Sequence, residues 1–193
     1  MKRIVVFCGA SAGHDPVFAA QAFRTGQYLA ETGIELVYGG AKVGLMGAVA
    51  DGTLQGGGRV IGVLPQFLRT KEVAHEHLTE LILVDTMHER KLKMHELSDG
   101  VMALPGGYGT LEELFEMLTW AQLGLHAKPV GLLNPDGFYD DLLKMADTMT
   151  RRGFLKEENR GMLLTATTVE ELVERMRQYQ PPRAPQWITK EQT

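Results

Sequence analysis

Residues 101–113 read VMALPGGYGTLEE: a short apolar run, a glycine-rich turn and the start of a helical pattern. The apolar run predicts a strand buried on both faces. Pro105 ends the strand, and three residues allow a compact loop without side chains: Gly106, Gly107 and Gly109. Thr110 and Glu113 have the spacing of a capping box, in which each residue bonds a free amide of the helix start. The segment therefore predicts a strand that leads into a helix through an anion-binding loop.

The same alternation of apolar runs and helical spacing continues along the chain. Six runs predict strands: Arg3 to Cys8, Ile34 to Tyr38, Val60 to Leu64, Leu81 to Val84, Val101 to Leu104 and Val130 to Leu133. Six segments predict helices: Pro16 to Thr32, Leu45 to Gln55, Met87 to Leu97, Thr110 to Leu125, Phe138 to Arg152 and Val169 to Tyr179. This order is typical of a doubly wound α/β protein, with a mostly parallel sheet and helices on both faces.

Length and composition predict one globular domain over residues 1–180, followed by a proline-interrupted arm over residues 181–193. The chain has 193 residues, 20 Lys plus Arg against 24 Asp plus Glu, and 44% hydrophobic residues. This mild acidity favours neither nucleic acid nor an anionic membrane as a partner, and no apolar run approaches the length of a membrane span. The only cysteine, Cys8, excludes an internal disulfide and is typical of a buried small hydrophobe in a cytoplasmic protein. Trp187 either has no role in the arm or anchors it to this subunit or a partner.

Glycines follow three of the predicted strands. Besides the turn at Pro105, they occur in FCGASAG, which contains Gly9 and Ser11, and in YGGAKVGLMG, which contains Gly39 and Gly40. Because ligands bind beyond the carboxyl ends of parallel strands, three such turns predict a phosphate or nucleotide site. The dinucleotide pattern G-x-G-x-x-G and the Lys-Ser/Thr pair of a P-loop are both absent.

Glu113 has two open interpretations, a helix cap or a carboxylate that faces the ligand. Arg90 lies in MHERK, a charged run that by itself is also typical of a solvated helix face. The six histidines show no HExxH spacing, so no metal site is predicted. The methionines are interpreted as core filling.

Several motifs together resemble the LOG (Lonely guy) family. These are the cytokinin riboside 5′-monophosphate phosphoribohydrolases, many of whose bacterial members were formerly labelled lysine decarboxylases. The pattern PGGxGTxxE is met by residues 105–113, MHxRK by residues 87–91 and YGGxxxGLMG by residues 38–47. TWAQLG at residues 119–124 and the later KPVGLLN also follow the family, so the resemblance covers nearly the whole chain.

The resemblance implies a Rossmann-like homodimer that cleaves the N-glycosidic bond of AMP or N6-substituted AMP to free base and ribose 5-phosphate. The essential pair of the family corresponds to Arg90 and Glu113. The substrate-contacting positions correspond to Lys91, Gly107, Tyr108, Gly109, Thr110, Glu112 and Thr119, and a further family glutamate aligns with Glu72. Gly106 belongs to the same loop. Ala10 replaces a hydroxyl residue of many relatives, which leaves Ser11 or the backbone as the phosphate contact there.

The residues fit the implied chemistry. Cleavage of a ribosyl bond develops positive charge on the sugar and negative charge on the base, which a carboxylate and a cation stabilise. The hypothesis is that Glu113 stabilises the sugar and activates water, while Arg90 fixes the nucleotide and Lys91 adds positive charge. No cofactor is predicted, because no lysine has the arrangement of a pyridoxal site. The alternative is a nucleotide- or cofactor-binding carrier of the same fold without catalysis.

Overall fold

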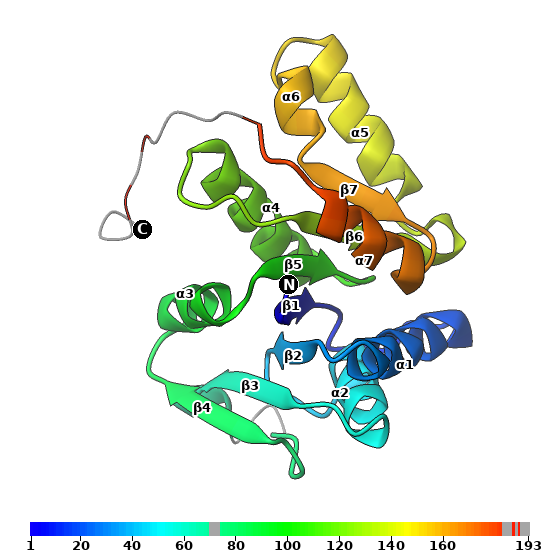
Figure 1. Ribbon diagram of the computed structural model, residues 1–193, viewed down its shortest axis with the longest axis vertical. Helices are drawn as coiled ribbons and strands as arrows, with labels where there is room; N and C mark the ends of the chain where they lie inside the picture. Colours follow the sequence, from blue (N-terminus) through cyan, green and yellow to red (C-terminus); the bar gives the residue numbers. More distant parts are fainter. Residues whose placement is uncertain (70–73, 183–186, 188, 190–193) are drawn as a thin grey trace.

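The computed structural model describes residues 1–69, 74–182, 187 and 189, which form one sheet flanked by helices (Figure 1). The strands are β1 Arg3–Phe7, β2 Glu35–Tyr38, β3 Val60–Pro65, β4 Glu80–Val84, β5 Gly100–Ala103, β6 Val130–Leu133 and β7 Leu163–Ala166. The helices are α1 Pro16–Glu31, α2 Gly44–Gln55, α3 Met87–Leu97, α4 Tyr108–Gln122, α5 Asp140–Arg151, α6 Glu157–Arg160 and α7 Val169–Gln178. Two short 3₁₀ helices are η1 Gln66–Leu68 and η2 Pro135–Gly137.

The seven strands are all parallel and lie in the order β4-β3-β2-β1-β5-β6-β7. The chain adds β2, β3 and β4 on one side of β1 and then returns to place β5 on its other side. The order therefore reverses between β1 and β5, and such a switch point opens a crevice at the carboxyl ends of the two strands. The predicted doubly wound α/β fold is confirmed.

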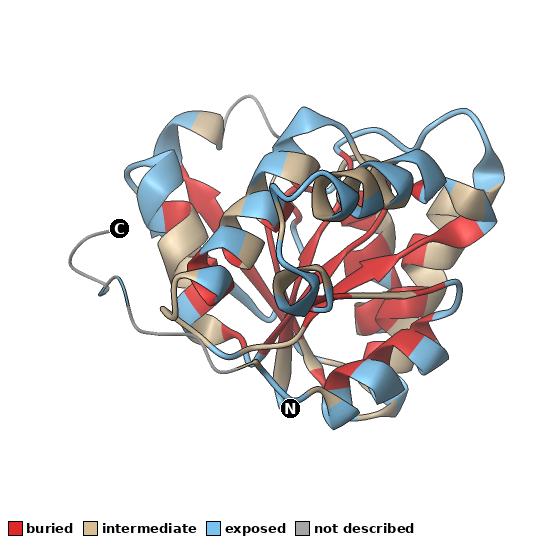
Figure 2. Cartoon of the chain, turned by 90° about the horizontal axis from the view of Figure 1, so that it is seen from above, coloured by how far each residue is buried: buried red, intermediate tan, exposed pale blue. Residues whose placement is uncertain are grey.

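Alternating side chains of each strand supply two cores, one on each face of the sheet. In β1, Ile4 and Val6 pack on one face with α1, α2 and α7, while Val5 and Phe7 pack on the other with α3 and α4. Figure 2 shows the buried strands between helices whose outer faces are exposed. Two-sided burial explains why the strands are continuous apolar runs in the sequence.

All six predicted strands are confirmed, whereas β7 was not predicted. Its sequence, LLTA, is only four residues long, and its two middle residues are partly exposed because it is the edge strand. The predicted helices form within two residues of their expected ends, apart from the C-terminus of α4, which ends at Gln122 instead of Leu125. Cys8 is buried and free, as predicted.

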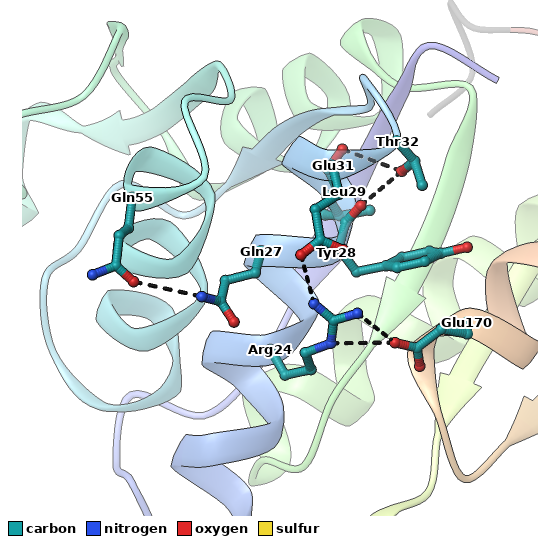
Figure 3. Close-up of polar contacts among 8 residues, drawn as sticks. All are labelled: Arg24, Gln27, Tyr28, Leu29, Glu31, Thr32, Gln55 and Glu170. Carbon is teal, nitrogen blue, oxygen red and sulfur yellow. Dashed lines mark hydrogen bonds and ion pairs between the residues drawn. The ribbon is translucent and has the colours of Figure 1, made fainter.

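The helices α1 and α2 pack closely because each presents a glycine to the other. A Cβ on Gly26 would lie 2.1 Å from the carbonyl oxygen of Val49, and a Cβ on Gly52 would lie 2.1 Å from that of Phe23. Polar contacts on the surface of α1 add to this packing (Figure 3). The guanidinium of Arg24 in α1 pairs with the carboxylate of Glu170 in α7 at 2.8 Å.

The described part of the C-terminal arm touches the body through its backbone. The N–H of Trp187 donates to the carbonyl oxygen of Leu123 at 2.9 Å, while the residue itself is 70% exposed. Residues 183–186, 188 and 190–193 lie outside the described residues. None of the helices described is long and apolar enough to cross a membrane.

The close contact between α1 and α2 predicts that one added methyl group at position 52 lowers stability. Gly52→Ala should lower stability by about 1–3 kcal/mol, because overpacking outweighs the gain of up to about 1 kcal/mol in helix propensity. Gly109→Ala, in the first turn of α4 where a Cβ meets nothing within 4 Å, is the matched control and should not lower the melting temperature. A Gly52→Ala protein as stable as the wild type would contradict the close packing of α1 on α2.

Candidate active site

A cavity of about 350 Å³ occupies the crevice between the ends of β1 and β5. Its walls come from the turn after β1, the turn after β2, the start of α3 and the first two turns of α4. The polar or glycine residues that line it are Gly9, Gly39, Arg90, Gly107, Gly109, Thr110, Glu112 and Glu113, and Cys8, Met46 and Met87 line its apolar part. Three glycine turns therefore meet at one site, as the sequence predicts.

The start of α4 presents free amides to this crevice. The N-cap is Gly107, and the first helical hydrogen bond runs from the N–H of Leu111 to the carbonyl of Gly107 at 3.1 Å. The N–H groups of Tyr108, Gly109 and Thr110 thus have no acceptor within the helix, and such a helix end is suited to bind an anion.

The predicted capping box is wrong. The helix begins at Tyr108 instead of at Thr110, and no side chain caps it. The glycines let the backbone enter the helix early, and the Thr110 hydroxyl instead lies against Gly106, where a Cβ would be 2.1 Å from Thr110 Oγ1. Because Thr110 does not cap the helix, Glu113 is not held in a capping box.

Arg90 is a buried cation held by backbone carbonyls. It is 6% exposed, its Nε donates to the carbonyl of Val63 at 3.1 Å, and its Nη2 donates to the carbonyl of Gly39 at 2.8 Å. A Cβ on residue 39 would lie 2.2 Å from Nη2, so glycine is required there. Nη1 contacts the sulfur of Met87 at 3.8 Å. Across the residues described, no carboxylate lies within 4 Å of this guanidinium, so its charge is available to an anionic ligand.

Glu113 lies in the same cavity with an altered proton affinity. Burial raises the pKa of its carboxyl to about 7; the charge of Arg90 opposes this shift, Glu112 adds to it, and smaller effects come from Lys91 and Glu116. A carboxyl with a pKa near neutrality is suited to act as a general base at physiological pH.

Lys91 lies behind the cavity wall, in contact with two carboxylates of α4. Its Nζ is 2.5 Å from Glu112 Oε1 and 2.9 Å from Glu116 Oε1. Glu112 lines the cavity, whereas Lys91 is not among the lining residues. The sequence did not indicate Glu116, which lies just beyond the PGGxGTxxE motif.

A second, more apolar cavity of about 390 Å³ adjoins the first across Gly9 and Gly107. Ser11 and Gly106 line this second cavity, together with Phe18, Leu45 and Phe138. The backbone of Gly9 ties the turns together, because its N–H donates to Pro105 O and its carbonyl accepts from Leu45 N.

Other predicted site residues lie apart from Arg90 and Glu113. The side chain of Tyr108 points to solvent, since this residue is 94% exposed. Gly40 faces Leu64 and Leu81, and Thr119 lines a separate groove between α4 and α5. Glu72 lies outside the described residues.

Six lining residues were not predicted as site residues: Val6, Phe7, Cys8, Ala10, Met46 and Met87. The sequence pattern is typical of a buried hydrophobe at Cys8 and of core filling at the methionines. Met46 and Met87 fall within YGGxxxGLMG and MHxRK, so their place in motifs that flank glycine turns was the available signal. In the part of the chain that the structure describes, no group of three or more His, Cys, Asp or Glu side chains could hold a metal ion.

Fold and cavity together define a parallel α/β protein with a cavity at its switch point. The family model described as "Possible lysine decarboxylase" matches residues 46–176. A rice protein (Oryza sativa subsp. japonica) named probable cytokinin riboside 5′-monophosphate phosphoribohydrolase LOGL1 is 51% identical over 177 residues, covering 92% of this chain and 79% of its own. The Arabidopsis thaliana enzyme named cytokinin riboside 5′-monophosphate phosphoribohydrolase LOG7 is 47% identical over 180 residues, covering 93% of this chain and 83% of its own. The chain therefore belongs to the LOG family, which confirms the resemblance seen in its motifs.

Solved structures share the fold. The X-ray structure of TM1055 superposes with a TM-score of 0.70 at 26% identity, covering 93% of this chain and all of that one. A molybdenum cofactor binding protein from the bacterium Rippkaea orientalis superposes with a TM-score of 0.69 at 25% identity, covering 92% and 97%.

The raised pKa of Glu113 predicts a pH-dependent gain in stability for Glu113→Gln. At pH 4 the carboxyl is neutral in both folded and unfolded protein, so the two melting temperatures should agree. Between pH 4.5 and about 7 the folded wild type binds more protons than the unfolded chain, so it loses stability as pH rises. At pH 8 the variant should melt about 3 °C or more above the wild type.

Calorimetry of both proteins at pH 4 and pH 8 measures this difference. The control is Glu157→Gln, which removes an exposed glutamate of α6 that does not line the cavity. If the melting temperature of Glu113→Gln differed from that of the wild type by the same amount at both pH values, the burial of an ionised carboxylate would be contradicted.

Proposed function

We propose that this protein is a phosphoribohydrolase, which cleaves the N-glycosidic bond of AMP and of N6-substituted (cytokinin) riboside 5′-monophosphates. The products are the free base and ribose 5-phosphate. The observation that carries the proposal is the meeting of Arg90 and Glu113, a buried cation without a carboxylate contact and a carboxyl with a pKa of about 7, in one cavity at the start of α4. The names of relatives 47% and 51% identical support the same activity.

The start of α4 is the binding site that we propose for the 5′-phosphate. The free N–H groups of Tyr108, Gly109 and Thr110 point along the helix axis, and the helix dipole favours a dianion there. Gly107 and Gly109 have no atom within 4 Å of an added Cβ, so the backbone is open to close approach. A phosphate at this end fixes the ribose over the second turn of α4, where Glu113 lies.

Glu113 then acts on the anomeric carbon. As the bond from C1′ to the base breaks, its electron pair leaves with the base and positive charge develops on the sugar, which the ionised carboxylate stabilises. Water adds to C1′ and gives its proton to Glu113, whose pKa of about 7 matches this transfer. The departing base takes up a proton, which Glu113 returns through solvent, so that free base and ribose 5-phosphate are released. The guanidinium of Arg90 holds the nucleotide and balances the negative charge that collects in the cavity.

The proposal also covers the domain organisation, cofactor use, localisation and oligomeric state of the enzyme. Residues 1–180 act as one catalytic domain, without a cofactor, in a cytoplasmic homodimer. The dimer is supported by the apolar side chains that α5 and its following turn leave exposed: Met145 is 53% and Phe154 87% exposed, and no residue of α5 is buried.

The test is a chromatographic assay with AMP and N6-isopentenyl-AMP, using adenosine as the control substrate without phosphate. The wild type should release base and ribose 5-phosphate from one or both nucleotides and not from adenosine. Glu113→Gln should lower kcat by about 10²–10⁴-fold, because it keeps the shape and removes the base. In the wild type kcat/KM should rise with pH and level off above about 7, as Glu113 ionises. Light scattering of the same preparation should give the mass of a dimer.

Glu157→Gln is again the matched control and should keep wild-type activity. Full activity of Glu113→Gln at saturating substrate would remove Glu113 from the chemistry. Nucleotide binding without any release of base would instead favour a carrier without catalysis; the structural neighbour from Rippkaea orientalis is named a cofactor binding protein.

A further inference from the structure

Lys91 lies between two carboxylates that α4 presents one turn apart. Its Nζ is 2.5 Å from Glu112 Oε1 and 2.9 Å from Glu116 Oε1. Lys91 follows Arg90 directly on α3, so this contact ties the helix that carries the buried guanidinium to the helix that carries Glu113. Figure 1 shows α3 and α4 as neighbours on the same side of β5.

The two ion pairs have different surroundings. The side chain of Glu112 is 57% exposed, whereas that of Glu116 is 21% and that of Lys91 12% exposed. Water and salt screen the contact with Glu112, but they screen the contact with Glu116 much less. Glu116 is therefore the partner that fixes the position of the ammonium group.

One carboxylate oxygen of Glu116 is unsatisfied. Oε2 is buried and has no hydrogen-bond partner among the described residues. An unsatisfied buried oxygen lowers stability, so a carboxylate is a poor choice for packing at this position. Its negative charge acts through Oε1, which contacts Lys91.

Glu116 also lies close to the proposed chemistry without reaching it. It follows Glu113 by three residues on α4, which places both on neighbouring parts of one helix face. It does not line the cavity, in contrast to Glu112 and Glu113. Its effect on a bound nucleotide is therefore indirect, through Lys91, which also contacts the cavity-lining Glu112, and through its charge, which raises the pKa of the Glu113 carboxyl.

We propose that Glu116 is a positioning residue, which holds the Lys91 ammonium behind the cavity wall and against Glu112, so that this positive charge acts on Glu113 and on a nucleotide bound at the start of α4. Glu112, the solvated partner, completes the contact at the cavity wall. The inference rests on the proposed phosphoribohydrolase function. It adds Glu116, a charged residue that acts on the site without touching the substrate.

The arrangement gives Lys91 and Glu116 opposite effects on Glu113. The Lys91 charge lowers the pKa of the Glu113 carboxyl, and the Glu116 charge raises it. Lys91→Met should therefore move the acid limb of the kcat/KM profile to higher pH, and Glu116→Gln should move it to lower pH.

The experiment is a double-mutant cycle with wild type, Glu116→Gln, Lys91→Met and the double variant. Glu116→Gln should lower kcat/KM for AMP about tenfold, because the ammonium loses its fixed position. In the Lys91→Met background the same change should cause no further loss, since no ammonium remains to be positioned. The melting temperature of each protein is recorded as a check on folding, and Glu157→Gln is the control for removal of an unrelated glutamate.

Two results would overturn the proposal. One is a loss from Glu116→Gln that is equally large with and without Lys91, which would show a structural role. The other is an unchanged kcat/KM and pH profile in Glu116→Gln. The Kd for AMP is also measured by titration calorimetry for the same four proteins. If the wild type cleaves no nucleotide, the phosphoribohydrolase function fails, and coupling between Glu116 and Lys91 in Kd still decides the positioning role.

Discussion

The architecture of the site depends on one buried positive charge. Arg90 is 6% exposed, and its guanidinium is held by the carbonyls of Gly39 and Val63, at the carboxyl ends of β2 and β3, instead of by a carboxylate. Carbonyl dipoles orient the group without neutralising it, so its positive charge remains at the cavity wall to pair with an anion. The same contact explains why residue 39 is glycine, because a Cβ would collide with Nη2.

The start of α4 adds the second half of the site. Within seven residues it offers free amides, an open backbone at Gly107 and Gly109, and the Glu113 carboxyl whose pKa lies near 7. Burial makes ionisation of Glu113 costly, and Arg90 and Lys91 reduce that cost. Binding and chemistry are therefore coupled through charge, because the phosphate, the two cations and the carboxylates all share one weakly screened region.

The sequence predicted what depends on local pattern. Six strands and six helices follow from apolar runs and helical spacing, and the glycine turns indicated the crevice because parallel strands end at one edge. Edge strand β7 was missed since its four residues, two buried and two partly exposed, give no clear period. The capping box at Thr110 failed for a different reason: three glycines allowed the helix to start two residues earlier, which spacing alone does not show. The ion pairs of Lys91 with Glu112 and Glu116 depend on how α3 packs beside α4, so only the fold reveals them.

The central claim, that Arg90, Glu113 and the start of α4 form one nucleotide site, is tested most directly by a crystal structure of Glu113→Gln with AMP. We predict phosphate oxygens at about 3 Å from the N–H groups of Tyr108, Gly109 and Thr110, with the ribose C1′ facing the side chain at position 113. A nucleotide whose phosphate lies away from these amides, with C1′ out of reach of position 113, would contradict the account.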